Sequence, residues 1–328
     1  MIDLDVRLES SLGELDYGYL YRLQGLAKKE ECILSFPENN RDDYIKTRES
    51  VLELLQTEDA LRYAFASLLS RLEREGHVYV EISFNPYLHT KGGLSVEEVT
   101  KIAVDILRIS LDTYNIDANI ILYSQRSTPL EITNQIATLA YRNRFNKVIG
   151  FGLEGDTDEV PLTRFTKIFN RMKKNNFPVV VELPKKLLTI TELNRAIKFG
   201  ARRIISCYGI DFTDKDIFTL NDCGIQIEYR FSHDLINGYM EKEEEFPLKS
   251  LWFRGFNGFL AGCSYSICGA SLDNEYKKLI AKNIFTLDMV RFALTKSLDA
   301  LFVPVKEKSK IAQHYAKQSI RYFDRLFK

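Results

Sequence analysis

Eight short apolar segments, each typical of a buried β-strand, alternate with helical patterns along the chain. They lie at 2–6, 78–84, 118–123, 148–153, 179–183, 203–206, 225–229 and 257–261. Strands separated by helices pair in parallel, because a crossover connection brings the chain back to the same edge. Eight such units in 328 residues predict an α/β fold, a (β/α)8 TIM barrel. An open doubly wound sheet is the alternative, but no glycine-rich phosphate-binding fingerprint follows a strand.

The helical patterns carry recognisable start and stop signals. Ser95 and Glu98 form a predicted capping box before an amphipathic segment. The same logic places helix starts at Thr128, which precedes a proline, and at Thr189. Gly200 fits the C-terminal cap of the helix that Thr189 opens. These signals support a helix after most of the strands.

Two regions depart from the plain alternation. An insert at 13–76 follows the first strand; its second half, 47–75, is strongly helical, and 28–43 has the composition of a turn-rich lid or brace. The segment 286–328 is predicted to form helices that pack outside the barrel. No linker, low-complexity tract or internal repeat divides the chain, so we expect one domain over 1–328.

Composition excludes several classes of protein. The 45 basic residues balance 45 acidic ones, which argues against binding to nucleic acid by phosphate neutralisation. No apolar run reaches the roughly 20 residues that span a bilayer, and the start lacks the order of a signal peptide. The five cysteines are scattered and form no CxxC pair. We expect a reduced, cytoplasmic protein that binds neither nucleic acid nor membrane.

Charged residues stand at the end of one predicted strand, in the stretch FPVVVELPKK. Glu182 closes the run of valines, and Lys185 and Lys186 follow it. The carboxyl ends of barrel strands are where active sites are built. This strand end is therefore the first candidate for a functional site.

The ordered strand ends resemble the adenosine/AMP deaminase family, which are zinc-dependent (β/α)8 hydrolases of the metal-dependent hydrolase superfamily. The segment VEISFNPYLHTKGGLSVEEV is similar to the family's VEIRFSP followed by GLT-EEV, and VIGFGLEGDTDE to VVGFDLAGDE. IEYRFSHDLING is similar to FEVCPTSNILTG, and ASLDNEYKKL to TLDNEY. The segments follow in the family's order over roughly 2–300. The resemblance implies the barrel fold, although a fold does not by itself confer an activity.

The metal ligands that the resemblance implies are replaced in this chain. Asp5 and Arg7 stand where the family has an HxH pair, and Glu9 stands where it has an aspartate. At the HAGE motif the chain has ELPK, so that Glu182 replaces a histidine ligand and Lys185 replaces the catalytic glutamate. The resemblance therefore implies a site in which the standard ligands are missing.

The remaining catalytic positions are also changed. Ser206 takes the place of the histidine in RIGHG, and Cys263 and Ser264 take the places of the two aspartates in NTDDP. The four histidines, at 77, 89, 233 and 314, match no ligand position, and we interpret each as a surface or capping residue. No catalytic residue, metal or cofactor is assigned.

These replacements predict a pseudoenzyme that has lost metal-dependent deamination. Arg7 and Lys185 put positive charge where the cation would lie, and they would pair with Asp5, Glu9 and Glu182 in a buried cluster. Candidates for binding a purine-nucleoside-like ligand are the residues that match the family's substrate side or flank its site: Glu9, Arg126, Gly155 and Asp156. A regulatory or scaffold subunit, homo- or hetero-oligomeric, is the other form of this hypothesis.

Enzymes with different chemistry remain alternatives. Lys185, beside Glu182, would form a Schiff base, or Cys263 beside Ser264 would act as a nucleophile. Asp5 and Glu182 would contribute to a rebuilt carboxylate site that favours magnesium or manganese over zinc. Arg7 argues against that last alternative.

Overall fold

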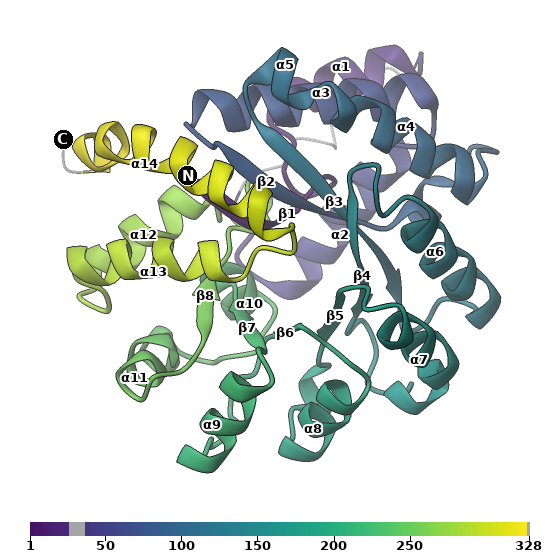
Figure 1. The fold of residues 1–328 in the computed structure, drawn as a ribbon. Helices are drawn as coiled ribbons and strands as arrows, with labels where there is room; N and C mark the ends of the chain where they lie inside the picture. Colours follow the sequence, from purple (N-terminus) through teal and green to yellow (C-terminus); the bar gives the residue numbers. More distant parts are fainter. Residues whose placement is uncertain (26–36, 327–328) are drawn as a thin grey trace.

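The eight predicted strands form one parallel sheet in sequence order (Figure 1). The computed structural model describes residues 1–25 and 37–326, with side chains up to Lys317. The strands are β1 (Ile2–Arg7), β2 (Tyr79–Phe84), β3 (Asp117–Gln125), β4 (Val148–Glu154), β5 (Val179–Glu182), β6 (Arg203–Ile205), β7 (Gln226–Tyr229) and β8 (Gly258–Leu260). Each strand pairs with the next in parallel, as the alternation of strands and helices predicts.

The first strand meets the chain that follows the last one. Val6 forms a parallel bridge with Cys263, whose backbone N–H donates to Asp5 O at 2.7 Å. The Arg7 N–H donates to Cys263 O at 3.1 Å. Cys263 has φ of 70°, an uncommon conformation for a residue other than glycine. This bridge closes the sheet into a barrel and confirms the predicted fold class.

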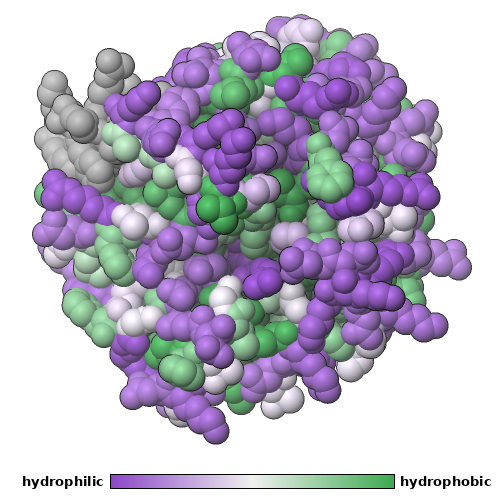
Figure 2. All heavy atoms as spheres, viewed as in Figure 1, coloured by the Kyte–Doolittle hydropathy of each residue, from purple (hydrophilic) through white to green (hydrophobic). Residues whose placement is uncertain are grey.

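Helices surround the strands, as Figure 1 shows. They are α1 (Glu14–Leu23), α2 (Arg41–Leu54), α3 (Glu58–Arg74), α4 (Val96–Arg108), α5 (Ser110–Tyr114), α6 (Leu130–Arg142), α7 (Thr166–Lys174), α8 (Ile190–Lys198), α9 (Asp214–Asp222), α10 (Phe231–Ile236), α11 (Leu248–Phe253), α12 (Leu272–Ala281), α13 (Leu287–Asp299) and α14 (Val305–Leu326). Short 3-10 helices are η2 (Pro86–His89), η3 (Leu162–Phe165), η4 (Lys185–Leu187) and η5 (Glu243–Glu245). Figure 2 shows mostly hydrophilic side chains on the face viewed. None of the helices described is both long and apolar enough to span a bilayer.

Most of the predicted helix ends are confirmed. Ser95 and Glu98 form the capping box of α4, and the Thr189 side chain accepts from the N–H of residue 192 at the start of α8. Gly200, with φ of 91°, follows the last turn of α8. The prediction for Thr128 is wrong, because the N-cap of α6 is Pro129, whose side chain has no hydrogen-bond acceptor.

The insert after β1 is more helical than predicted. Its helices α1, α2 and α3 begin at 14, 41 and 58, and of the predicted lid at 28–43, residues 28–36 lie outside the described residues. Tyr17, Leu20 and Tyr21 are buried at helical spacing in α1. The Gly13 N–H donates to Asp16 Oδ2 at 2.7 Å and closes the start of that helix.

The interior of the barrel contains charged side chains among the apolar ones. Arg203, from β6, is fully buried and donates from Nη2 to Glu81 Oε2 at 2.8 Å and from Nη1 to Leu4 O at 2.9 Å. Glu228, from β7, lies 3.7 Å from the same guanidinium. Burial, and then the charge of Asp5, raises the pKa of Glu228 well above its ordinary value. Charged side chains are therefore paired inside the barrel.

A second buried polar group links β1 to the loop after β8. The Tyr265 hydroxyl lies 3.0 Å from Asp3 Oδ2 and 2.9 Å from His77 Nε2. Burial raises the pKa of Asp3 to about 7, against hydrogen bonds that include those from Gly262 N–H and Tyr265.

Asp3→Asn is predicted to change how stability depends on pH. An aspartate titrates near pH 3.9 when unfolded, so ionising Asp3 in the folded state costs stability that grows between about pH 4 and pH 7 and then levels off. The variant lacks this cost, so its unfolding free energy relative to the parent should rise by on the order of a few kcal/mol across that window. Urea unfolding at several pH values measures it, with the exposed Asp42→Asn as control. A difference that stays constant with pH would contradict the account.

Candidate functional site

A cavity of about 170 Å³ opens at the carboxyl ends of the strands. Strand and loop residues that line it include Arg7, Glu154, Gly155, Asp156 and Glu182, and helix α10 contributes His233. Helix α2 of the insert contributes Arg41, Tyr44, Ile45 and Arg48, which share one helical face. The predicted strand end and part of the insert therefore meet around one cavity.

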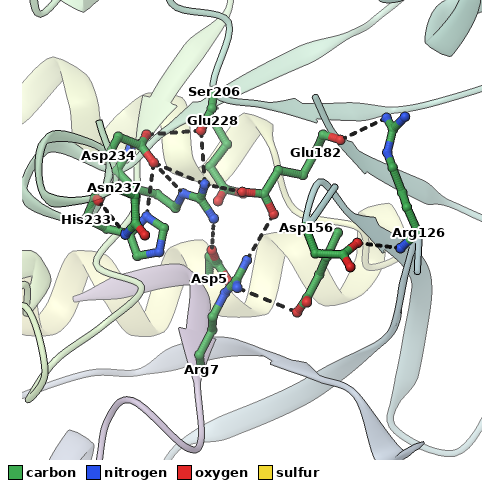
Figure 3. A network of polar contacts seen from close by, with 12 residues as sticks. Asp5, Arg7, Arg126, Asp156, Glu182, Ser206, Glu228, His233, Asp234 and Asn237 are labelled. Carbon is green, nitrogen blue, oxygen red and sulfur yellow. Dashed lines mark hydrogen bonds and ion pairs between the residues drawn. The ribbon is translucent and has the colours of Figure 1, made fainter. Parts of the chain in front are cut away.

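Arg230 lies among three carboxylates, those of Asp5, Glu182 and Asp234, which are labelled in Figure 3. It directly follows β7 and is fully buried. Its Nη2 donates to Glu182 Oε1 at 2.5 Å, and its Nε donates to Asp234 Oδ1 at 3.1 Å. Its Nη1 lies 3.8 Å from Asp5 Oδ2. Carboxylates from β1, β5 and α10 thus converge on one guanidinium.

Arg7 forms a second, looser centre beside the first. Its Nη2 lies 3.3 Å from Glu182 Oε2, its Nη1 3.5 Å from Glu154 Oε1 and its Nε 4.0 Å from Asp5 Oδ1. Glu182 and Asp5 therefore bridge Arg7 and Arg230. The predicted pairing of Arg7 with Asp5 and Glu182 is present, whereas Glu9 pairs with Arg48.

The two guanidiniums set the charge state of the carboxylates between them. Burial opposes ionisation of Glu182, but Arg230 and then Arg7 hold its pKa below the ordinary range. Arg7 and Arg230 likewise lower the pKa of Asp5 against burial, and Arg230 lowers that of Asp234. These three groups are carboxylates near neutral pH and serve as acceptors, not as proton donors.

Lys185 does not lie in this cluster, which corrects the prediction. It is exposed at the rim of the cavity, in η4, near Gly238. Arg230 supplies the second buried positive charge instead. One signal in the sequence could have identified Arg230. It stands at a strand end, at the position where the family segment FEVCPTSNILTG has cysteine.

Ser206, Cys263 and Ser264 are buried where the predicted alignment puts them. Ser206 Oγ donates to Asp234 Oδ2 at 3.1 Å and accepts from Arg230 Nη2 at 3.0 Å. Ser206 and Cys263 have φ of 62° and 70°. Burial raises the pKa of the Cys263 thiol well above its ordinary value, which keeps it protonated.

Of the four ligand-binding candidates, the cavity lining includes Gly155 and Asp156. Arg126 is fully buried and donates to Val160 O at 3.0 Å and to Glu182 O at 3.2 Å. Its backbone N–H donates to Asp156 Oδ1 at 2.6 Å. Arg126 therefore positions the loops after β4 and β5.

Glu9 anchors the insert to the barrel. Arg48, from α2, donates to Glu9 Oε1 from Nε at 2.9 Å and from Nη2 at 2.6 Å. Arg48 Nη2 also lies 3.8 Å from Glu154 Oε1. This ion pair holds the face of α2 that carries Tyr44 over the cavity.

His77, His89 and His233 are buried, so none of them is a surface residue, but His77 and His89 contact carbonyls at the C-terminal ends of α3 and α2, as the capping alternative predicts. His89 Nδ1 lies 2.9 Å from Leu55 O, and its ring stacks on Phe84. His233 lines the cavity, and its Nδ1 lies 3.1 Å from Asp234 Oδ1. His233 is the histidine placed to meet a ligand.

Comparison with known proteins decides the family. The model of the adenosine deaminase family matches residues 25–318. The chain belongs to the adenosine deaminase family. It is 24% identical to the adenosine deaminase of Haemophilus ducreyi over 96% of this chain and 95% of that protein.

Solved structures of deaminases share the fold. An adenine deaminase from Arthrobacter aurescens superposes with a TM-score of 0.83 at 16% identity, over 97% of this chain and 98% of that one. The Arabidopsis N6-mAMP deaminase gives 0.82 at 16% identity, over 96% and 97%. At this identity the likeness shows the fold alone, and the function depends on the residues of the site.

The residues at the strand ends do not fit the metal that the family implies. Across residues 1–25 and 37–326, no group of three or more His, Cys, Asp or Glu side chains is arranged to hold a metal ion. A divalent cation between Asp5 and Glu182 would also have to share its place with the Arg7 and Arg230 guanidiniums. We therefore derive no reaction step through a metal.

Arg230→Met is predicted to cost about 3–5 kcal/mol of unfolding free energy. The change leaves Glu182 and Asp234 buried without their main partner, and leaves Asp5 with Arg7 alone. Arg254→Met, which removes a more exposed pair with Asp214, should cost no more than about 1 kcal/mol. Urea unfolding compares the two. Equal losses would show that the buried cluster does not stabilise the fold.

Gly155→Ala is predicted to disturb the loop that lines the cavity. An added Cβ would lie 3.0 Å from Pro184 N and 3.1 Å from Glu182 O, both backbone atoms. We expect a loss of about 1–3 kcal/mol. Gly18→Ala is the matched control, because its Cβ would meet nothing within 4 Å and helix α1 should gain about 0.5–1 kcal/mol. Thermal unfolding separates the two, and a neutral Gly155→Ala would contradict the close approach.

Proposed function

We propose that this chain is a pseudoenzyme of the adenosine deaminase family, which has lost metal-dependent deamination and binds a small molecule at the strand ends. One observation carries the proposal. The Arg230 guanidinium is enclosed by Asp5, Glu182 and Asp234, at the point where the family resemblance puts the metal. The fixed positive charge of the Arg230 side chain takes the place of an exchangeable metal ion.

The chemistry at this centre supports loss of deamination. Deamination of this class uses a metal that lowers the pKa of bound water to about 7. Glu182 and Asp234 are held as weak bases by Arg230, and Cys263 is kept as a thiol. The Ser206 hydroxyl is engaged with Asp234. None of these four groups is arranged to activate water.

The cavity supports ligand binding over a purely structural role. It is lined by Gly155 and Asp156, which match the family's GD pair, and α2 covers it through the Arg48–Glu9 pair. A regulatory subunit that senses a small molecule fits these features. A scaffold without a ligand predicts a stable oligomer and no thermal shift with small molecules.

The Schiff-base alternative has one supporting observation, that Lys185 lines the cavity. Its ammonium group is exposed, however, and lacks the desolvated pocket in which such lysines are activated. The geometry therefore favours the binder over this enzyme.

Purified protein supplied with zinc should release no ammonia above background from adenosine, adenine or AMP. The physical reason is that no metal-bound water forms at the Arg230 centre. A zinc-dependent adenosine deaminase assayed in parallel controls for the detection of ammonia. Zinc-dependent release that a chelator abolishes would overturn the proposed function.

A further inference from the structure

The ion-pair network that forms part of the cavity wall contains more carboxylates than guanidiniums. Arg7, Arg48 and Arg230 supply three positive charges. The carboxylates within 4.0 Å of them are Asp5, Glu9, Glu154, Glu182 and Asp234. All five carboxylates are buried, so water does not screen the imbalance. The network as a whole therefore has room for one more positive charge, and Glu154 and Glu182 are its carboxylates that line the cavity.

Glu154 is the least well paired member of this network and faces the cavity. Its ion pairs are long, at 3.5 Å to Arg7 and 3.8 Å to Arg48, whereas Glu182 meets Arg230 at 2.5 Å and Glu9 meets Arg48 at 2.6 Å. Burial raises the pKa of Glu154 despite both arginines. A cation in the cavity would give Glu154 the partner that the protein does not fully supply.

His233 provides a second, independent sign of a ligand. Its side chain is 3% exposed, and its Nε2 has no hydrogen-bond partner in the part of the chain that the structure describes. Burial, and then the charge of Arg230, lowers the pKa of His233, so the ring is neutral near pH 7. Asp234 is ionised and can only accept, so Nδ1 carries the proton and Nε2 is an acceptor. Figure 3 shows the ring beside Asp234.

Aromatic rings complete the wall around these two acceptors. Tyr44 and Tyr239 line the cavity, and the Tyr44 ring meets His233 edge-on at 5.4 Å between centroids. Tyrosine faces attract cations and accommodate carbon chains. Four cationic side chains also line the cavity. Arg7 and Arg48 are paired with carboxylates of the network, whereas Arg41 and Lys185 are exposed at the rim, where solvent and salt screen their charges.

We propose that the cavity binds a small organic cation carrying N–H donors, with Glu154 as its charge partner and His233 Nε2 as a hydrogen-bond acceptor. An organic ammonium suits two acceptors that are not grouped as metal ligands, since its donors can be spaced along a carbon chain. The inference rests on the proposed function, because a metal ion at the site would neutralise the same carboxylates.

Three four-carbon probes differ in end-group charge and test the proposal. Putrescine is cationic, 1,4-butanediol is neutral and succinate is anionic. Isothermal titration and thermal unfolding of the full chain should show saturable binding for putrescine alone. Ammonia release and metal content are measured on the same samples, so that failure of the proposed function is seen separately.

Variants identify the residues responsible. Glu154→Gln keeps the shape and removes the charge, and His233→Asn removes the ring acceptor; each should weaken putrescine binding at least about tenfold. Glu58→Gln, at an exposed pair with Arg62, should leave binding unchanged. Arg41→Gln, at the rim, should leave it unchanged or tighten it. Thermal unfolding confirms that each variant is folded.

The outcomes separate cleanly. Selective binding of putrescine that both Glu154→Gln and His233→Asn weaken supports the proposal. Preference for succinate, equal binding of butanediol, or no binding by any probe overturns it, and the proposed function stands if ammonia and metal remain at background. Putrescine binding that survives both variants also overturns the assignment to this cavity.

Discussion

The hydrogen bond from Arg230 to Glu182 is the contact on which the rest of the site depends. It joins the end of β5 to the end of β7, and the same guanidinium reaches Asp234 in α10 and Asp5 in β1. Buried carboxylates are costly unless they are paired and hydrogen-bonded. Arg230 compensates three of them at once and thereby lets this barrel keep a charged centre.

The surrounding elements are arranged around that centre. Arg126 fixes the loops after β4 and β5, and Arg48 holds α2 to Glu9. The left-handed conformations of Ser206 and Cys263 cost on the order of 1–2 kcal/mol each, and the backbone contacts of β7 and β1 hold them. The barrel fold therefore holds these charged side chains together at its strand ends.

Much of the fold could be predicted because its signals are local. The apolar period of the strands and the caps at Ser95 and Thr189 are read from a few neighbouring residues. The helix start predicted at Thr128 is wrong because Pro129 is the N-cap residue of α6. Helix α1 was not predicted, because a short helix with three buried residues gives only a weak helical pattern of apolar residues.

The site was only partly predictable, because it depends on how far long side chains reach. Glu182 was identified from its place at a strand end, and Arg7 from the resemblance, because it stands in the place of the family's HxH pair. Lys185 and Arg230 are both cations just after strands, and sequence alone does not tell which one turns inward. The segments that resemble the family did hold a signal: Glu154, Arg230 and His233 stand where those segments have alanine, cysteine and serine. Three substitutions at strand-end positions, taken together, indicate a changed site more strongly than any one of them alone.

The central claim is that guanidinium groups hold the place of the metal ion. Its most direct test is the zinc content of the chain, purified without chelators, dialysed against zinc and measured by elemental mass spectrometry. The account predicts far less than one ion per chain, with no change in thermal stability on adding zinc. A content of about one zinc per chain, bound tightly enough to survive dialysis against buffer, would contradict it.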